Sequence, residues 1–108
     1  MLWSVEALND IVGDEILALP RDIRSKLEHI SMMIESLGLE RMREPYVKHL
    51  RGSLWEMRLI GRDGIARAIY VTASGRRIIV LHAFVKKTQK TPSAALNLAL
   101  DRAKEIER

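Results

Sequence analysis

Residues 51–92 decide the fold and read RGSLWEMRLIGRDGIARAIYVTASGRRIIVLHAFVKKTQKTP. Three runs within this stretch are rich in β-branched or aromatic residues, as β-strands usually are, and they lie at 54–60, 65–72 and 78–85. The segments between them, GRDG and SG, suit tight loops because glycine tolerates the positive φ angles of such loops. The stretch therefore predicts three antiparallel strands joined by two short loops.

The expected register of these strands places charged residues side by side. If residues 61–64 form the first loop, Arg58 faces Arg67. If residues 74–75 form a two-residue turn, Arg67 also faces His82, and all three side chains point to one face of the sheet. Like charges directly across a ladder repel each other by roughly 0.2–1 kcal/mol. Such a row indicates a surface that binds an anion.

The clearest helical pattern of the chain covers residues 21–37. Apolar residues recur there at alternating spacings of four and three, which is one stripe of a 3.6-residue period: Ile23, Leu27, Ile30, Ile34 and Leu37. Pro20 suits the start of this helix, and Gly38 suits the left-handed residue beyond its end.

Weaker patterns predict the other elements. We expect a short opening strand at 2–6, a short helix at 10–19 and a polar connection at 38–53. A last helix follows, with Thr91 as its capping hydroxyl and Pro92 at its first position. This order predicts an α+β fold with an antiparallel sheet, two N-terminal helices and a C-terminal helix. We expect the helices on one side of the sheet and the charged row on its other, free side.

The length of 108 residues fits a single domain that spans 1–108. The chain has no cysteine, so it can form neither a disulfide nor a thiolate metal site. Its first residues, MLWSVEALND, lack the basic start and long apolar run of a signal peptide. We therefore expect a cytoplasmic protein without a membrane segment.

The charge of the chain is unevenly distributed. Residues 1–44 carry 5 basic and 9 acidic residues, a balance of −4, whereas residues 45–108 carry 13 and 5, a balance of +8. A basic half of this kind favours a polyanionic partner, most simply a nucleic acid. The alternative is a solvated basic face that binds nothing.

Known catalytic motifs are absent from the sequence. The three histidines are scattered without metal-ligand spacing, and there is no GxSxG motif, phosphate-binding glycine loop or dinucleotide fingerprint. What is present is a group of arginines and lysines with Glu56 and His82. Cations can stabilise the charge that develops in phosphodiester cleavage, and RNA supplies its own nucleophile, the 2′-OH. The alternative makes Glu56 and Arg67 a structural salt bridge and His82 a structural residue.

Three segments resemble the phage-related HigB branch of the RelE-like toxins. They are LWEMR at 54–58, RAIY at 67–70 and FVKKTQKTP at 84–92. The resemblance implies a RelE-like fold and the toxin of a type II toxin–antitoxin pair, a ribosome-dependent mRNA endoribonuclease that works by 2′-OH attack without a cofactor or metal. It also implies a helix-turn-helix antitoxin as partner, with operon DNA bound only through that antitoxin.

The resemblance, together with the pattern of basic residues, gives candidate roles for individual residues. Candidate catalytic residues are Arg58, Arg67, Lys87 and Glu56, although the position of Glu56 is lysine in some relatives. Candidate contacts to RNA or the ribosome are Lys48, Arg51, His82, Lys86 and Lys90. Relatives also use a late tyrosine or histidine, and no aromatic residue or histidine follows Phe84 here. Two other functions stay open: a non-catalytic RNA- or ribosome-binding module, and a phage-derived protein-interaction domain.

Overall fold

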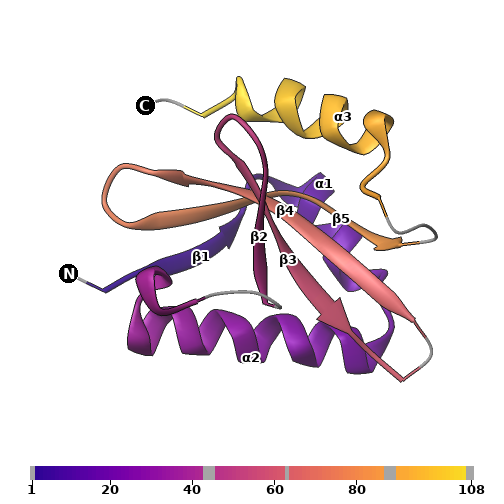
Figure 1. Cartoon of the computed structure of the whole chain (residues 1–108), viewed down its shortest axis with the longest axis horizontal. Coiled ribbons are helices and arrows are strands. Elements are labelled where there is room, and N and C mark those ends of the chain that lie inside the picture. The colour runs from indigo at the N-terminus through magenta and orange to yellow at the C-terminus, as the bar shows by residue number, and fades with distance from the viewer. Residues whose placement is uncertain (1, 43–45, 63, 87–89, 107–108) are drawn as a thin grey trace.

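The computed structural model describes residues 2–42, 46–62, 64–86 and 90–106. Figure 1 shows a sheet with helices around it. The elements follow in the order β1 (Ser4–Ala7), α1 (Asp10–Leu17), α2 (Arg21–Leu37), the 3₁₀ turn η1 (Leu39–Arg41), β2 (Val47–Arg51), β3 (Leu54–Ile60), β4 (Ile65–Ala73), β5 (Arg77–Lys86) and α3 (Ser93–Ala103). The predicted α+β fold is confirmed.

The sheet has five strands in the order β1-β5-β4-β3-β2. The three predicted strands are β3, β4 and β5, which pair antiparallel as expected. The opening strand β1 pairs with β5 in parallel, so the sheet is not wholly antiparallel. Strand β2 lies within the predicted polar connection at 38–53. The sequence VKHLR concealed it because three of its five residues are charged or imidazole side chains, which are common on an exposed edge strand.

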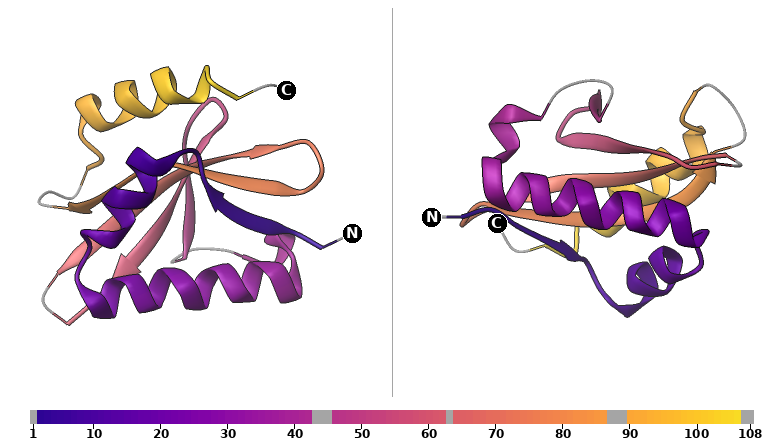
Figure 2. Two further views of the ribbon diagram at one scale, coloured as in Figure 1. Left: turned by 180° about the vertical axis from the view of Figure 1, so that it is seen from behind. Right: turned by 90° about the horizontal axis from the view of Figure 1, so that it is seen from below.

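Helices cover both faces of the sheet, which corrects the expectation of one free face. Helix α2 lies against one face and α3 against the other, and α1 lies beside β5 (Figures 1 and 2). The α2 side buries a cluster that includes Ile34, Met57 and Tyr70. The α3 side buries a smaller cluster that includes Leu54 and Ile69. Helix α3 packs closely because its buried residues are all alanines: Ala95, Ala99 and Ala103.

Helix α2 has the predicted bounds and most of the predicted buried stripe. Ile23, Leu27, Ile30 and Ile34 are buried, but Leu37 is 55% exposed because the helix ends there beyond the sheet. Gly38 follows with φ of +90°, as expected for the residue after the helix. No helix among the described residues is long and apolar enough to cross a membrane.

The register confirms one half of the predicted charged row and corrects the other. Arg58 faces Arg67 across β3 and β4, as expected. On its other side, Arg67 faces Phe84 rather than His82. The loop between β4 and β5 has three residues, 74–76, instead of two, and a register shift in this pair near Ile69 adds a second residue. Together these move His82 to the next row, opposite Ile69.

Candidate functional site

The α3 side of the sheet arranges its charged residues in rows across the strands. The pairings of β3, β4 and β5 give three neighbouring rows: Glu56–Ile69–His82, Arg58–Arg67–Phe84 and Ile60–Ile65–Lys86. Lys48 of β2 adds to the first row opposite Glu56. Since side chains on one face of a strand recur every second residue, these rows bring Glu56, Arg58, Arg67 and Lys86 together on one face of the sheet, which forms the candidate surface.

At the centre of this surface lies a buried ion pair. Arg67 is 2% exposed and Glu56 is fully buried, and Nη1 of Arg67 lies 2.5 Å from Oε1 of Glu56. Nη1 of Arg67 also donates to Oγ1 of Thr91 at 2.7 Å, and this hydroxyl donates to Oε2 of Glu56 at 2.9 Å. The three side chains therefore form a closed ring of hydrogen bonds. The structure thus contains the salt bridge that the sequence left as an alternative.

The role expected for Thr91 was wrong. Helix α3 begins at Ser93, and its cap residue, Pro92, makes no side-chain hydrogen bond to the helix. The hydroxyl of Thr91 turns to the sheet instead, where it has two charged partners. Charge-assisted hydrogen bonds are about twice as strong as neutral ones, which accounts for this preference.

Two half-buried cations, Arg58 and Lys86, lie next to the ion pair. Neither side chain makes a hydrogen bond or an ion pair with any residue that the structure describes. Burial lowers the pKa of Lys86, and the positive charges of Arg67, Arg58 and Lys48 lower it further, against the opposing effect of Glu56. The cations outnumber the single carboxylate here, so the surface is suited to an anion such as a phosphate.

His82 belongs to a separate cluster. Its Nδ1 lies 2.9 Å from Oε1 of Glu15, and its ring stacks on Phe84 with a centroid distance of 4.8 Å. Oε2 of Glu15 also forms an ion pair with Nη2 of Arg102 at 2.9 Å. Nη1 of Arg102 donates to Oε1 of Glu15 at 3.0 Å and to the carbonyl of Leu81 at 2.8 Å. This cluster joins α1, β5 and α3, so the contacts of His82 are structural ones.

The environment of Glu15 favours its charged form. Burial alone would raise its pKa, but hydrogen bonds from Arg102, His82 and the amide of Ala83 together lower the pKa below the ordinary value of 4.5. The carboxylate is therefore charged at neutral pH and can hold both basic partners.

The remaining predicted site residues lie at the margin of the surface or outside the described part of the chain. Lys48 is exposed and faces Glu56 across β2 and β3. Arg51 is exposed at the far end of β2, opposite Leu54. Lys90 is exposed directly before Thr91. Lys87 lies outside the described residues.

Sequence reasoning missed Thr91, Glu15 and Arg102 as parts of these clusters. Thr91 stands 24 and 35 residues from its two partners, and Arg102 stands 87 residues from Glu15. No local pattern links such positions. The one local signal is the Thr-Pro pair at 91–92, which favours a helix cap.

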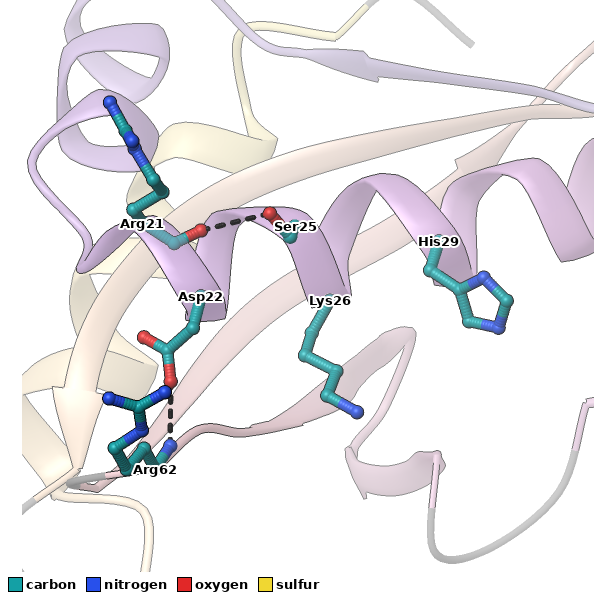
Figure 3. A pocket seen from close by; sticks show the side chains of 6 residues that line it. All are labelled: Arg21, Asp22, Ser25, Lys26, His29 and Arg62. Atoms are coloured by element: carbon teal, nitrogen blue, oxygen red, sulfur yellow. Dashed lines mark hydrogen bonds between the residues drawn. The ribbon is translucent and has the colours of Figure 1, made fainter.

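A separate open cavity of about 770 Å³ lies where α2 begins beside the loop between β3 and β4 (Figure 3). Its lining contains none of the predicted site residues: Arg21, Asp22, Ser25, Lys26, His29 and Arg62. Oδ2 of Asp22 accepts the backbone N–H of Arg62 at 2.6 Å, the contact drawn in Figure 3. In Figure 3 the side chain of Arg21 extends away from Lys26 and Arg62. The cavity therefore lies between the start of α2 and the loop after β3, apart from the charged rows of the sheet.

Metal-ligand groups are also absent from the described part of the chain. Its His, Asp and Glu residues form no group of three or more that could hold a metal ion.

The fold is that of RelE proteins. A mutant of the E. coli toxin RelE in the free state superposes with a TM-score of 0.66 at 19% sequence identity, covering 94% of this chain and 98% of that one. RelE from the archaeal RelE–RelB complex of Pyrococcus horikoshii OT3 superposes with a TM-score of 0.56 at 21% identity, covering 79% and 96%. No curated protein sequence matches the chain significantly.

A comparison of the sequence with protein-family models identifies the family of the chain. A family model described as "Phage derived protein Gp49-like (DUF891)" matches residues 14–104, which contain α2, the four strands β2 to β5 and α3. The resemblance drawn from the LWEMR, RAIY and FVKKTQKTP segments is thereby confirmed at the level of family and fold. The chain belongs to the Gp49-like, phage-derived family.

Proposed function

We propose that this chain is the toxin of a type II toxin–antitoxin pair and that it cleaves mRNA on the ribosome. The observation that carries the proposal is the row in which Arg58 faces Arg67, with Lys86 in the next row, on the sheet of a RelE-like fold. Arg58 and Lys86 have no carboxylate partner among the described residues, and Lys86 has a lowered pKa, which suits the binding and cleavage of a phosphodiester.

The reaction is a transesterification within the RNA. The 2′-oxygen forms a bond to phosphorus while the bond from phosphorus to the 5′-oxygen breaks. The proton of the 2′-OH passes to a base, and the departing 5′-oxygen receives a proton from an acid. The products carry a 2′,3′-cyclic phosphate and a 5′-hydroxyl.

The accessible cations act on the phosphate in this proposal. Arg58 and Lys86 contact the phosphoryl oxygens and stabilise the negative charge that builds up on them. Lys86 also donates the proton to the 5′-oxygen, because a lowered pKa makes its ammonium group a stronger acid. Lys87, outside the described residues, remains a proposed catalytic neighbour. Lys48, Arg51 and Lys90 extend the basic surface for the RNA or the ribosome.

Arg67 and Glu56 act from behind this surface. Both side chains are almost wholly buried and bonded to each other, so neither reaches a substrate in this conformation. Arg67 contributes positive charge close to Lys86, and Glu56 fixes the orientation of Arg67. We therefore assign Arg67 an electrostatic role and Glu56 a positioning role.

The proposed partners follow from the proposed class of protein. They are a helix-turn-helix antitoxin, the ribosome with its mRNA, and operon DNA through the antitoxin, all in the cytoplasm. The P. horikoshii RelE that shares the fold was solved as a complex with RelB, which supports an antitoxin partner.

A non-catalytic RNA- or ribosome-binding module is the second candidate. It is favoured by the burial of Arg67 and Glu56, which leaves the basic surface without an exposed carboxylate from this pair. Such a module would bind RNA with an affinity that falls steeply with salt, but would leave the RNA intact.

The test is mRNA cleavage in a reconstituted translation reaction, with cut sites mapped by primer extension. Wild type, Arg58→Ala and Lys86→Ala are compared with and without ribosomes. Lys104→Ala is the control, because its side chain is 79% exposed and lies in the turn after α3. We expect ribosome-dependent cuts with 5′-hydroxyl ends in wild type and control, and weak or no cuts in the other two variants. Intact mRNA with wild type would overturn the proposal in favour of the binding module.

A further inference from the structure

We propose that Thr91 is a positioning residue of this site, which holds Arg67 and Glu56 in the orientation that cleavage requires. The inference rests on the proposed endoribonuclease function and assigns a role that the sequence pattern placed elsewhere, at the cap of α3. Its basis is the closed ring in which one hydroxyl contacts both members of the buried ion pair.

The hydroxyl of Thr91 serves as donor and acceptor at once. Its single proton goes to Oε2 of Glu56 at 2.9 Å, and its oxygen accepts from Nη1 of Arg67 at 2.7 Å. Oε1 of Glu56 is already bonded to the same Nη1. A serine or threonine hydroxyl suits this place because it supplies both a donor and an acceptor on one atom.

This contact ties the sheet to the start of α3. Glu56 and Arg67 belong to β3 and β4, whereas Thr91 precedes the first turn of α3 by two residues. Pro92 follows with φ of −60°, so the ring of proline restricts the chain next to the hydroxyl. The hydroxyl is therefore presented from a locally rigid segment, which is how a positioning group works best.

A change at Thr91 would reach the reacting groups through Arg67. Arg67 faces Arg58 in the strand register, and its charge lowers the pKa of Lys86. If the guanidinium loses the Thr91 contact, its distance to Arg58 and Lys86 is held less firmly by the ring. Electrostatic stabilisation of a transition state depends on such fixed distances.

The experiment compares Thr91→Val with Thr91→Ser in the reconstituted cleavage reaction. Valine keeps the shape and removes the hydroxyl, whereas serine keeps the hydroxyl and removes a methyl group. We expect Thr91→Val to lower the single-turnover cleavage rate by about 10- to 100-fold, as for the loss of charge-assisted hydrogen bonds. Its ribosome affinity should stay as in wild type, and Thr91→Ser should restore the rate to within about threefold. Urea unfolding establishes that both variants are folded.

Each outcome decides between this inference and its alternatives. Full cleavage by Thr91→Val would overturn the positioning role, and equal loss in both variants would assign the effect to the methyl group. If wild type itself does not cleave, the proposed function fails, and NMR of the Arg67 guanidinium still tests the contact. A resonance that is ordered in wild type and Thr91→Ser but averaged in Thr91→Val supports the anchoring, and equal spectra overturn it.

Discussion

Removing one member of the buried ion pair should strongly destabilise the protein. Arg67 is 2% exposed and Glu56 is fully buried, so Arg67→Met leaves a carboxylate in the interior without its cation. Breaking a buried pair in this way costs about 3–5 kcal/mol. Since small domains are stable by only about 5–15 kcal/mol, this variant should show a strongly reduced urea midpoint.

Removing both members should cost far less. Glu56→Leu combined with Arg67→Met replaces the pair by apolar side chains of similar size, a change that is often neutral or stabilising by about 1–4 kcal/mol. The hydroxyl of Thr91 loses both partners in this variant, which offsets part of that gain at about 1–3 kcal/mol. We therefore expect the double variant to unfold near the midpoint of wild type and well above that of Arg67→Met.

Urea unfolding followed by circular dichroism measures these differences, with Lys104→Met as control. Lys104 pairs with Asp101 at 3.5 Å on the surface, where both side chains are at least 75% exposed, so its midpoint should not move. A midpoint of Arg67→Met close to wild type would refute the reasoning, because the pair would then be hydrated. A double variant as unstable as Arg67→Met would refute the part that assigns the loss to the unpaired charge.

The remaining predictions concern acid stability, backbone space and a partly exposed ring. The lowered pKa of Glu15 adds stability above pH 4.5, and this stability is lost as the pH falls through the folded-state pKa. Glu15→Gln should therefore make the melting temperature depend less on pH in the acid range, and an unchanged dependence would contradict this. A Cβ on Gly61 would lie 2.6 Å from an atom of Ile23, so Gly61→Ala should cost about 1–3 kcal/mol in urea unfolding. Gly13→Ala in α1 is the control and should stabilise the protein by about 0.4–1 kcal/mol, since no atom lies within 4 Å of a Cβ at this position. Equal effects of the two variants would contradict the close approach of Gly61 to Ile23. Trp55→Ala should cost less than the about 3–5 kcal/mol of a buried aromatic residue, because Trp55 is 38% exposed. A larger loss in urea unfolding would contradict this partial exposure.

Local patterns predicted the elements whose residues report on their own neighbours. Helix α2 and strand β3 begin and end at the predicted residues, because a long apolar stripe and a run bounded by turn residues are visible within one segment. The pairing of Arg58 with Arg67 followed from the short loop between their strands. Strand β2 is the opposite case, since a five-residue edge strand with exposed charges has no buried face to mark it.

The rest of the site depends on contacts between distant segments. The three-residue loop at 74–76 needs left-handed backbone at Arg76 as well as at Gly75, and an arginine rarely indicates that conformation. The register shift in β5 leaves no mark in the composition of the strand. The local sequence favours Thr91 as the cap of α3. Its hydroxyl bonds to the buried ion pair instead, because charge-assisted hydrogen bonds are stronger. For Thr91, electrostatic contacts between distant segments thus outweighed the local helix-cap preference.

The site also contains more positive charge than the protein neutralises by itself. Glu56 pairs with Arg67, while Arg58 and Lys86 have no carboxylate partner among the described residues. Burial lowers the pKa of Lys86, and the positive charges of Arg67 and Arg58 lower it further, so the protein disfavours a proton at this place. An anion bound between Arg58 and Lys86 would offset part of this excess positive charge. The same charges that repel one another in the free protein would then bind the phosphate, and they would hold it most tightly when its negative charge is greatest, in the transition state of cleavage.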